Sequence, residues 1–373
     1  MVNRSANPPL EDLRKIVDPF AIPGTLLEGQ GFGSGHINDT FVATYDESGK
    51  RVRYIVQRVN HEVFKNVPQL MENITRVTSH MALKNTSGDS RRALTLLKCD
   101  DGRSCHQTPQ GEFWRVYRFI EGARTYDAID DPRQAYQAAR AFGQFQLVLA
   151  DLPGGRLHET IPHFHDTPKR LENLRKAADE DVMGRKSEVL AELEFVFQRG
   201  HEASKLLDLA AKGEIPERVT HNDTKLNNVM LDNITGEGIC VIDLDTVMPG
   251  LSLYDFGDLV RSCANTAAED ETNLARIDVS LPVFEAIVQG YIAGAGDILT
   301  AAEWDHLVFA GKLMTYEVGI RFLTDYLQGD IYFKTQHDRH NLERARNQLR
   351  FVDRIEAADN TLRAIVEKVR GAV

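Results

Sequence analysis

The stretch His221-Asn222-Asp223-Thr224-Lys225-Leu226-Asn227-Asn228 is followed by a second acidic string, Ile242-Asp243-Leu244-Asp245. The residues between them are expected to form a strand, a turn and a second strand, at 228–232, 233–238 and 239–242. Such a hairpin is expected to bring the side chains of Asp223, Asn228 and Asp243 to one edge.

The three side chains at this edge offer oxygen atoms of the kind that Mg²⁺ binds. Mg²⁺ usually takes one or two protein carboxylates, while waters and phosphate oxygens fill its other positions. Asn228, through its amide oxygen, and Asp243 are therefore the expected Mg²⁺ ligands. A further carboxylate beside the metal can orient a hydroxyl group and accept its proton, and we expect Asp223 in that role. This set of groups is typical of phosphoryl transfer.

Two neighbouring residues have less specific expectations. Asp245 lies two residues after Asp243 on the same expected strand edge, so its side chain is expected to point the same way. It is a further candidate metal ligand, and binding of a sugar hydroxyl is the alternative. His221 is expected to hold the loop by hydrogen bonds rather than to accept a proton.

The string Asp255-Phe256-Gly257 resembles the one in which protein kinases place a metal-binding aspartate, but the spacing favours Asp243. Asp243 follows Asn228 by 243 − 228 = 15 residues, room for one tight hairpin, whereas the aspartate of the later string follows it by 27. That aspartate and Asp258 are expected to anchor the start of the following helix, where backbone N–H groups are free. Arg261 is expected to form a salt bridge with Asp258.

Composition describes an ordinary globular chain and excludes some partners. The 373 residues are enough for two domains or two lobes, with 42% hydrophobic and 27% charged residues. A net charge of −11 argues against nucleic acid or an anionic membrane as a partner. No apolar run approaches the ~20 residues that cross a bilayer, and the amino terminus lacks an apolar signal region, so we expect a cytoplasmic protein. The four cysteines lack zinc-like spacing and are expected to be structural thiols.

The predicted elements change in kind along the chain. The first third reads as strands with one helix at 66–84, and hairpins are expected at 40–59 and 94–120. After residue 121 most segments have helical spacing, which predicts an α+β arrangement with an N-terminal lobe at 1–120 and a C-terminal lobe at 121–373. The expected helices lie at 132–149, 167–178, 187–212, 279–293, 303–327 and 341–369.

A glycine-rich segment, Gly29-Gln30-Gly31-Phe32-Gly33-Ser34-Gly35, lies between two expected strands. Backbone N–H groups at Gly31 and Gly33 can approach a phosphate closely because no side chain intervenes. The segment lacks the lysine of a Walker loop and opens no helix. Together with the metal motif downstream, it predicts a loop that covers phosphates or substrate.

A kinase-type nucleotide site also needs a cation from the third strand, paired with a helix glutamate. Here that strand has no lysine, and Arg58 is the best substitute, with Gln57 as the alternative. Val56 shares its face and is expected to touch adenine, and Glu72 is the expected partner of Arg58. The segment Phe119-Ile120-Glu121 is expected to offer backbone groups to the base.

By these residues the chain resembles the aminoglycoside/choline kinase-like branch of the protein-kinase-like fold. His221-x-Asp223-x₄-Asn228 matches that branch's catalytic loop, and 242–245 matches its metal-binding strand end. Four longer strings look closer still to the N-acetylhexosamine 1-kinases. They are HNDTKLNN (221–228), VIDLDTVMPG (241–250), GHINDT (35–40) and YDFGD (254–258). The likeness extends from about Gly29 to about Tyr332.

The resemblance implies a two-lobed kinase that transfers phosphate from ATP, with Mg²⁺, to the anomeric hydroxyl of a free N-acetylhexosamine. It implies sugar contacts at His36, Asp39, Arg321 and Tyr332, besides the catalytic carboxylate. Arg321 lies in an apolar helix, and its charge would repel a polycationic aminoglycoside or choline. The alternatives are a kinase for another small alcohol and an inactive nucleotide-binding module, and no obligate protein partner is expected.

Overall fold

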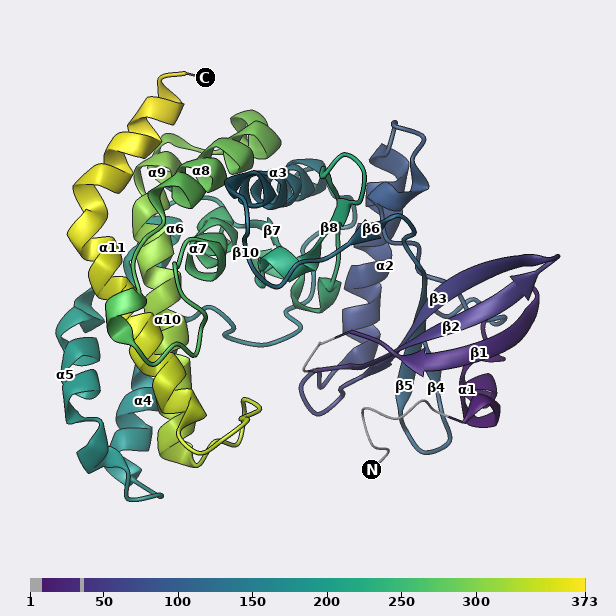
Figure 1. The fold of residues 1–373 in the computed structure, drawn as a ribbon, viewed down its shortest axis with the longest axis horizontal. Coiled ribbons are helices and arrows are strands. Elements are labelled where there is room, and N and C mark those ends of the chain that lie inside the picture. The colour runs from purple at the N-terminus through teal and green to yellow at the C-terminus, as the bar shows by residue number, and fades with distance from the viewer. Residues whose placement is uncertain (1–8, 34–36, 373) are drawn as a thin grey trace. The chain divides into compact units, whose positions relative to one another are not determined.

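The computed structural model describes residues 9–33 and 37–372 and divides the chain into two compact units (Figure 1). Unit 1 contains the chain up to Ala123 together with 151–161 and 239–247, and unit 2 contains 124–150, 162–238 and 248 onward. The sequence predicted a single division between residues 120 and 121. In the structure, two later segments, 151–161 and 239–247, also belong to unit 1.

Asn73 gives the physical reason why the two later segments belong to unit 1. Its side chain is fully buried on helix α2, which spans Val67–Lys84. The side-chain amide donates to the carbonyl oxygens of His158 (2.8 Å) and Val247 (3.1 Å), and its oxygen accepts from the His158 N–H (3.0 Å). Because a buried amide must find partners, these bonds attach both segments to α2.

Five antiparallel strands form the sheet of unit 1 in the order β1-β2-β3-β5-β4 (Figure 1). Ser48 and Gly49, both with positive φ, make the tight turn between β2 and β3, so the hairpin expected at 40–59 is confirmed. The strands are β1 (Thr25–Gly31), β2 (Asp39–Glu47), β3 (Lys50–Val59), β4 (His106–Gln107) and β5 (Phe113–Arg118).

One face of this sheet is covered by helix α1, Leu10–Val17. Leu13 is fully buried against it, and Gly29 is required opposite because a Cβ there would lie 2.1 Å from the Leu13 side chain. Val56 and Trp114 lie in the same apolar cluster. The face that contains Val56 is therefore a packed core.

The second expected hairpin of unit 1 is only partly observed. β4 and β5 pair as a short hairpin, but 94–99 forms no strand. Leu96 makes one isolated bridge to Tyr117, and Cys99 makes another to Phe20. The apolar residues of this segment fill the core without continuing the sheet, which is a case of packing overriding β propensity.

Unit 2 is mainly helical, as the sequence predicts. The expected helix at 187–212 is divided by a 3-10 turn at Gly200–Glu202, where a Cβ on Gly200 would lie 2.9 Å from Leu171. Its helices are α3 (Pro132–Leu149), α4 (Thr167–Glu180), α5 (Leu190–Arg199), α6 (Lys205–Ala211), α7 (Ser252–Cys263), α8 (Leu281–Ala295), α9 (Ala301–Asp305), α10 (Leu307–Gln328) and α11 (His340–Arg370).

Short strands interrupt these helices around the decisive stretch. β7 (Arg218–Thr220) pairs antiparallel with β10 (Met248–Gly250). β8 (Val229–Asp232) and β9 (Gly238–Val241) lie on either side of a turn, so the expected strand, turn and strand are observed. The Asp232 carboxylate closes that turn by accepting from the N–H groups of Ile234 and Thr235.

Helices α3 and α8 cross at very short range. A Cβ on Gly290 would lie 2.2 Å from the carbonyl oxygen of Tyr136, and one on Gly294 would lie 2.1 Å from that of Arg140. On the other side, a Cβ on Gly143 would lie 2.4 Å from the Tyr291 carbonyl oxygen. Glycine at these positions permits the backbones of the two helices to come into contact. Helix α3 also contacts strand β7.

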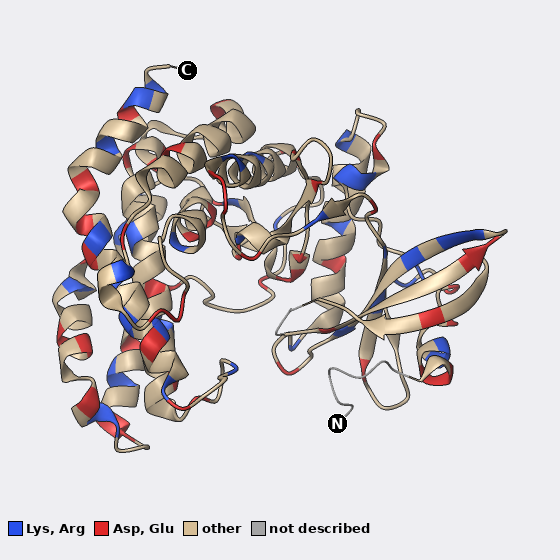
Figure 2. Cartoon of the chain, viewed as in Figure 1, with Lys and Arg blue, Asp and Glu red and all other residues tan. Residues whose placement is uncertain are grey.

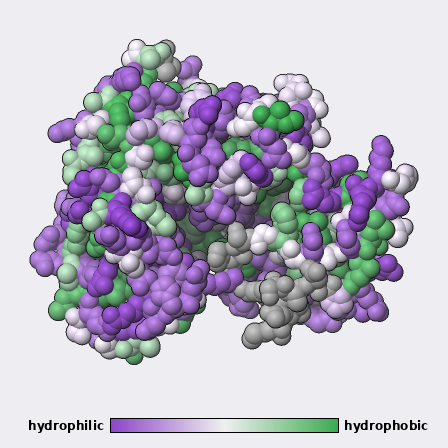
Figure 3. Space-filling view, viewed as in Figure 1, coloured by the Kyte–Doolittle hydropathy of each residue, from purple (hydrophilic) through white to green (hydrophobic). Residues whose placement is uncertain are grey.

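The surface is of the ordinary mixed kind. Figure 2 shows Lys and Arg alternating with Asp and Glu along α11, and hydrophilic residues predominate on the face of unit 2 drawn in Figure 3. Within 9–33 and 37–372, no helix has the length and apolar character needed to span a bilayer.

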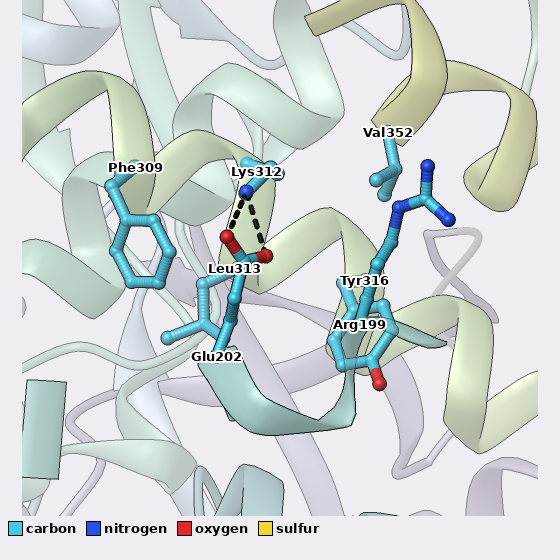
Figure 4. Close-up of a pocket in the computed structure, with 7 residues that line it drawn as sticks. All are labelled: Arg199, Glu202, Phe309, Lys312, Leu313, Tyr316 and Val352. Carbon is cyan, nitrogen blue, oxygen red and sulfur yellow. Dashed lines mark hydrogen bonds and ion pairs between the residues drawn. The ribbon is translucent and has the colours of Figure 1, made fainter. Parts of the chain in front are cut away.

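A small cavity lies among α5, α10 and α11 (Figure 4). Its volume is about 10 Å³, which holds no more than one water molecule. Lys312 and Glu202 pair across it at 2.7 Å, with Tyr316 beside them. It is a packing defect, not a ligand site.

Replacement of Gly290 by alanine is expected to destabilise the protein by about 1–3 kcal/mol, because the added methyl group forces α3 and α8 apart. This cost exceeds the helix propensity that alanine gains over glycine, about 1 kcal/mol. The exposed neighbour Gln289→Ala is the matched control, with an expected change within about 0.5 kcal/mol. Thermal denaturation measures both, and an unchanged Tm for Gly290→Ala would contradict the close crossing.

Candidate active site

The backbone of the catalytic loop, residues 221–228, is held by buried carboxylates of α7. Asp255 accepts from the N–H groups of His221 (2.9 Å) and Asn222 (2.7 Å), and from the side-chain amide of Gln146 (2.5 Å). Asp258 accepts from the N–H of Thr224 at 2.8 Å. Because charged hydrogen bonds in a dry site are strong, these contacts fix the shape of the loop.

This arrangement corrects one expectation and confirms another. Asp255 and Asp258 do not cap their own helix, because α7 begins after Leu251 without a side-chain cap and both carboxylates point to the loop. The salt bridge between Asp258 and Arg261 is present at 2.6 Å. Burial raises the pKa of Asp255, and the His221 ring and the donors from the loop and Gln146 oppose that shift.

Asn222 adopts the left-handed conformation that few non-glycine residues tolerate, with φ 64°. Its side chain exchanges hydrogen bonds with Thr220, accepting from the hydroxyl (2.9 Å) and donating to the carbonyl oxygen (3.2 Å). Gly250 is required opposite, because a Cβ there would lie 2.3 Å from the Thr220 hydroxyl. The chain is thereby turned sharply just before Asp223.

Asp223 is partly exposed, with 26% of its side chain accessible, and two residues of its own loop contact it. The Lys225 ammonium lies 2.8 Å from Oδ1, and the Asn228 amide nitrogen donates to Oδ2 at 3.1 Å. Burial alone would raise the pKa of Asp223, but Lys225 outweighs it and the pKa is lowered. The lowered pKa favours the ionised form of the carboxylate.

Lys225 is a functional candidate that the sequence reasoning missed. It lies between Asp223 and Asn228 in the decisive stretch, and its side chain is 44% exposed. A lysine beside an acceptor carboxylate offers a point charge to a phosphoryl group. Its fixed place two residues after Asp223 was the available signal.

His221 is fully buried and has the surroundings of a structural residue. Its ring meets Phe142 and Phe145 edge to face, at centroid distances of 5.2 and 5.9 Å. The Asp223 N–H donates to its Nδ1 at 3.3 Å. These contacts agree with the expected role of holding the loop.

Asp243 lies in unit 1, where strand β9 has ended. It has φ 59°, its side chain is exposed, and a 3-10 turn at Leu244–Thr246 follows it. The left-handed conformation costs a non-glycine residue of order 1–3 kcal/mol, and such strain concentrates at functional sites. The exposed carboxylate fits the expected metal ligand by its chemistry.

Asp245 is buried whereas Asp243 is exposed, although both were expected on one strand edge. The chain leaves the strand before these residues, so strand alternation no longer applies, and Asp245 is buried. One of its carboxylate oxygens pairs with Arg115 and the other accepts from Asn38 at 2.6 Å. Its contacts are those of a structural anchor for Asp243.

The expected ion pair between Arg58 and Glu72 is wrong. Arg58 pairs with Asp39 on the neighbouring strand and with Glu112 at 2.7 Å, while Glu72 pairs with His158 at 3.0 Å. The face that Arg58 shares with Val56 is the packed core, and Val56 is fully buried, so that face presents nothing to adenine.

Gln57 lies on the opposite face of β3, where it binds Arg115, a residue that the sequence reasoning missed. Arg115 in turn binds Asp245. The Gln57 side-chain oxygen accepts from Arg115 Nε (3.1 Å) and Nη2 (3.0 Å). Arg115 is 1% exposed and pairs in turn with Asp245. Its place in the middle of the otherwise apolar run 113–117 was the signal that could have identified it.

The glycine-rich segment and the expected hinge meet in unit 1. Phe32 packs edge to face on Phe119 with centroids 5.7 Å apart, and Gly33 has φ 79°. Apart from chain neighbours, no atom of residues 9–33 and 37–372 lies within 4 Å of a Cβ built on Gly31 or Gly33. Glu121 forms an ion pair with Arg53 at 2.5 Å. Ile120 lies between Phe119 and Glu121 in sequence.

The expected acceptor residues are described only in part. His36 lies outside the described residues, and Asp39 is already paired with Arg58. In unit 2 the guanidinium of Arg321 lies against the rings of Phe164, Tyr332 and Phe333, at 5.2, 5.8 and 5.4 Å from their centroids. Arg321 and Tyr332 are therefore brought together.

Replacement of Arg115 by methionine is expected to cost about 3–5 kcal/mol, because it leaves the Asp245 carboxylate buried and unpaired. The control Arg51→Met removes an exposed ion pair of the same sheet, with Glu28, and is expected to cost about 0–1 kcal/mol. Urea denaturation measures both variants. Equal losses in the two would rule out a special role for the buried pair.

Comparison with known proteins identifies the family and the fold of this chain. The model of the phosphotransferase enzyme family matches residues 28–294, which is more than half of the chain. A spectinomycin phosphotransferase solved with ADP and spectinomycin has 15% identity and a TM-score of 0.60, covering 94% of this chain and 98% of its own.

Two further solved structures have the same fold. An aminoglycoside phosphotransferase from Alicyclobacillus acidocaldarius has 13% identity and a TM-score of 0.63, with coverage of 95% and 96%. A choline kinase from Cryptosporidium parvum has 16% identity and a TM-score of 0.54, with coverage of 90% and 91%. The two-lobed kinase-like fold expected from the sequence is confirmed, and the chain belongs to the phosphotransferase enzyme family.

Proposed function

We propose that this phosphotransferase is a Mg²⁺-dependent kinase that transfers the γ-phosphate of ATP to the anomeric hydroxyl of a free N-acetylhexosamine. The observation that supports it most is the partly exposed carboxylate of Asp223, flanked by Lys225 and Asn228 in a loop whose backbone is fixed. A module that only binds nucleotide has no need of such a group.

The reaction asks Asp223 to orient the sugar hydroxyl and accept its proton while the hydroxyl oxygen attacks the γ-phosphorus and the bond to ADP breaks. Its lowered pKa keeps the carboxylate in the basic form. Lys225 is placed to neutralise charge on the transferred group. Alignment of the reacting atoms supplies much of the acceleration in such a site.

Mg²⁺ is the proposed metal, because Asn228 and Asp243 each offer an oxygen atom of the kind that it binds. The Asn228 amide nitrogen is used by the Asp223 carboxylate and carbonyl, which leaves the amide oxygen as the ligand atom. Asp243 offers an exposed carboxylate, and we prefer it to Asp245 because both oxygens of Asp245 are already bonded. When bound, the metal neutralises phosphate charge.

For the nucleotide, we propose that phosphates lie under the glycine-rich segment at Gly31 and Gly33, and that backbone groups of 119–121 face the base. Open space around both glycines supports this placement. We propose that Gln57 and Arg115 together take the place of the usual strand lysine and its partner. Arg115 binds both Gln57 and Asp245, and Asp245 lies two residues after the proposed metal ligand Asp243.

For the acceptor, we propose Arg321 and Tyr332, and with less support from its contacts Asp39. The proposal of an N-acetylhexosamine rests on the resemblance of the four strings named above. Burial lowers the pKa of the Arg170 guanidinium, and the nearby charge of Arg321 lowers it further. Two guanidinium groups disfavour a cationic acceptor such as choline, which is the main alternative among small alcohols.

A panel of acceptors tests the substrate. ADP release is expected with N-acetylglucosamine or N-acetylgalactosamine and at a much lower rate with glucose, galactose, choline or kanamycin. The guanidinium groups of Arg170 and Arg321 disfavour the two cationic acceptors, and the resemblance to N-acetylhexosamine 1-kinases is the reason to expect slow turnover of glucose and galactose. Proton NMR of the product is expected to show phosphate on the anomeric oxygen. Preferred turnover of choline or kanamycin would reject the sugar assignment while leaving the phosphotransferase chemistry in place.

Replacement of Asp223 by alanine is expected to lower kcat by at least about 100-fold, since the hydroxyl loses its orienting base. ATP binding, measured by thermal shift with Mg²⁺-ATP, is expected to persist. Asp232→Ala is the control, because that carboxylate closes the turn after β8 by accepting from Ile234 and Thr235. Turnover within about tenfold of wild type would remove Asp223 from its role.

A further inference from the structure

His165 is a buried histidine between two acceptors, just before α4. Its Nδ1 lies 2.8 Å from Oε1 of Glu317 on α10, and its Nε2 lies 3.1 Å from the carbonyl oxygen of Asn222 in the catalytic loop. All three residues belong to unit 2. The side chains of His165 and Glu317 are 5% and 0% exposed, so water does not screen the pair.

Neither partner has a proton to give to the ring. A carbonyl oxygen only accepts, and the second carboxylate oxygen of Glu317 already accepts from the Thr167 hydroxyl at 2.6 Å. Burial would raise the pKa of Glu317, but besides His165 itself the Thr167 hydroxyl and the Arg321 guanidinium lower it, and both act whatever the charge of His165. Two hydrogen bonds from the ring therefore require a proton on each nitrogen.

The other charged and titratable groups around the ring do not replace this pairing. Tyr254 of α7 stacks on it at 5.0 Å, and burial raises the pKa of that phenol. Asp166 pairs with His163 at 3.0 Å, and Arg170 donates to the Phe164 carbonyl oxygen. Arg321, four residues after Glu317 on the same helix, is the remaining charge.

The carbonyl that His165 holds belongs to the residue with the strained backbone. Asn222 has φ 64°, and its N–H is bound by Asp255 while its side chain is bound by Thr220. The carbonyl oxygen lies in the peptide unit that joins Asn222 to Asp223. A donor on that oxygen therefore fixes the orientation of the peptide from which the Asp223 side chain projects.

We propose that His165 is a doubly protonated positioning residue, which links the acceptor-side helix α10 to the catalytic loop and sets the direction of the Asp223 carboxylate. This proposal rests on the function proposed above for Asp223. His165 touches no reacting atom and acts through the Asn222 peptide. Because Glu317 and Arg321 share a face of α10, the same link connects the proposed acceptor residue to the loop.

The charge state of His165 is tested without any substrate. In protein labelled with ¹⁵N at histidine, the ring of His165, assigned by its loss in His165→Asn, is expected to show protonated nitrogens at both positions at neutral pH. In Glu317→Gln the amide still accepts a hydrogen bond but has no charge, and the His165 ring is expected to become neutral. A neutral ring in the wild type overturns the proposal.

The positioning role is tested by kinetics. His165→Asn keeps one donor but loses the charge, and we expect kcat to fall by about 10- to 100-fold with the KM for ATP within about twofold of wild type. His163→Asn is the matched control, because His163 lies two residues away, is 69% exposed and pairs with the neighbouring Asp166 rather than with the loop at 221–228. Its kinetic constants are expected to be unchanged.

The two proposals fail in different ways. If Asp223→Ala retains turnover, the function proposed for Asp223 fails, and the NMR result still decides the charge of His165. If Asp223→Ala is inactive but His165→Asn has wild-type kcat, the positioning role is overturned alone. A third outcome is that kcat and Tm fall together in His165→Asn and fall by as much in His165→Gln. That result would mean a purely structural role for His165 and would also overturn the positioning role.

Discussion

The catalytic loop depends on one buried carboxylate. Asp255 is fully buried and accepts from two successive backbone N–H groups of the loop and from Gln146. A charge in that position costs several kcal/mol unless hydrogen bonds compensate it, so the loop, α3 and α7 must keep their mutual geometry. The close crossing of α3 with α8 supports Gln146 from below, where Tyr291 donates to its side-chain oxygen at 3.0 Å.

Each unit contains a buried aspartate close to a more exposed one. In each, a buried aspartate is satisfied by fixed donors, while a second aspartate nearby stays accessible: Asp255 and Asp223 in unit 2, Asp245 and Asp243 in unit 1. In each, a non-glycine residue in the left-handed conformation turns the chain beside or at the accessible carboxylate. Strain of this kind persists only where surrounding contacts over-determine the backbone. In unit 2, Asp255 supplies such contacts to the backbone of His221 and Asn222, while Asp223 stays partly exposed.

Much of the fold could be predicted from local pattern. The β2–β3 hairpin, helix α2, helix α3 and the strand, turn and strand at 229–241 all follow from periodicity and turn residues close together in sequence. The candidate residues of the catalytic loop were identifiable because their spacing is short and fixed. The errors share a different cause. Arg58 was assigned to Glu72, and 94–99 to a strand, because neighbouring strands and core packing decide such partners.

The sequence by itself determined the kind of chemistry, since Asp223, Asn228 and Asp243 are oxygen donors within one short stretch, and it determined the α+β character through its change of periodicity. Only the tertiary structure decided which acids are exposed for chemistry and which are buried as anchors. Asp245 and Asp255 look equivalent to Asp243 and Asp223 in sequence. Their partners, Arg115 and Gln146, lie 130 and 109 residues away, so burial and charge compensation appear only once the chain has folded.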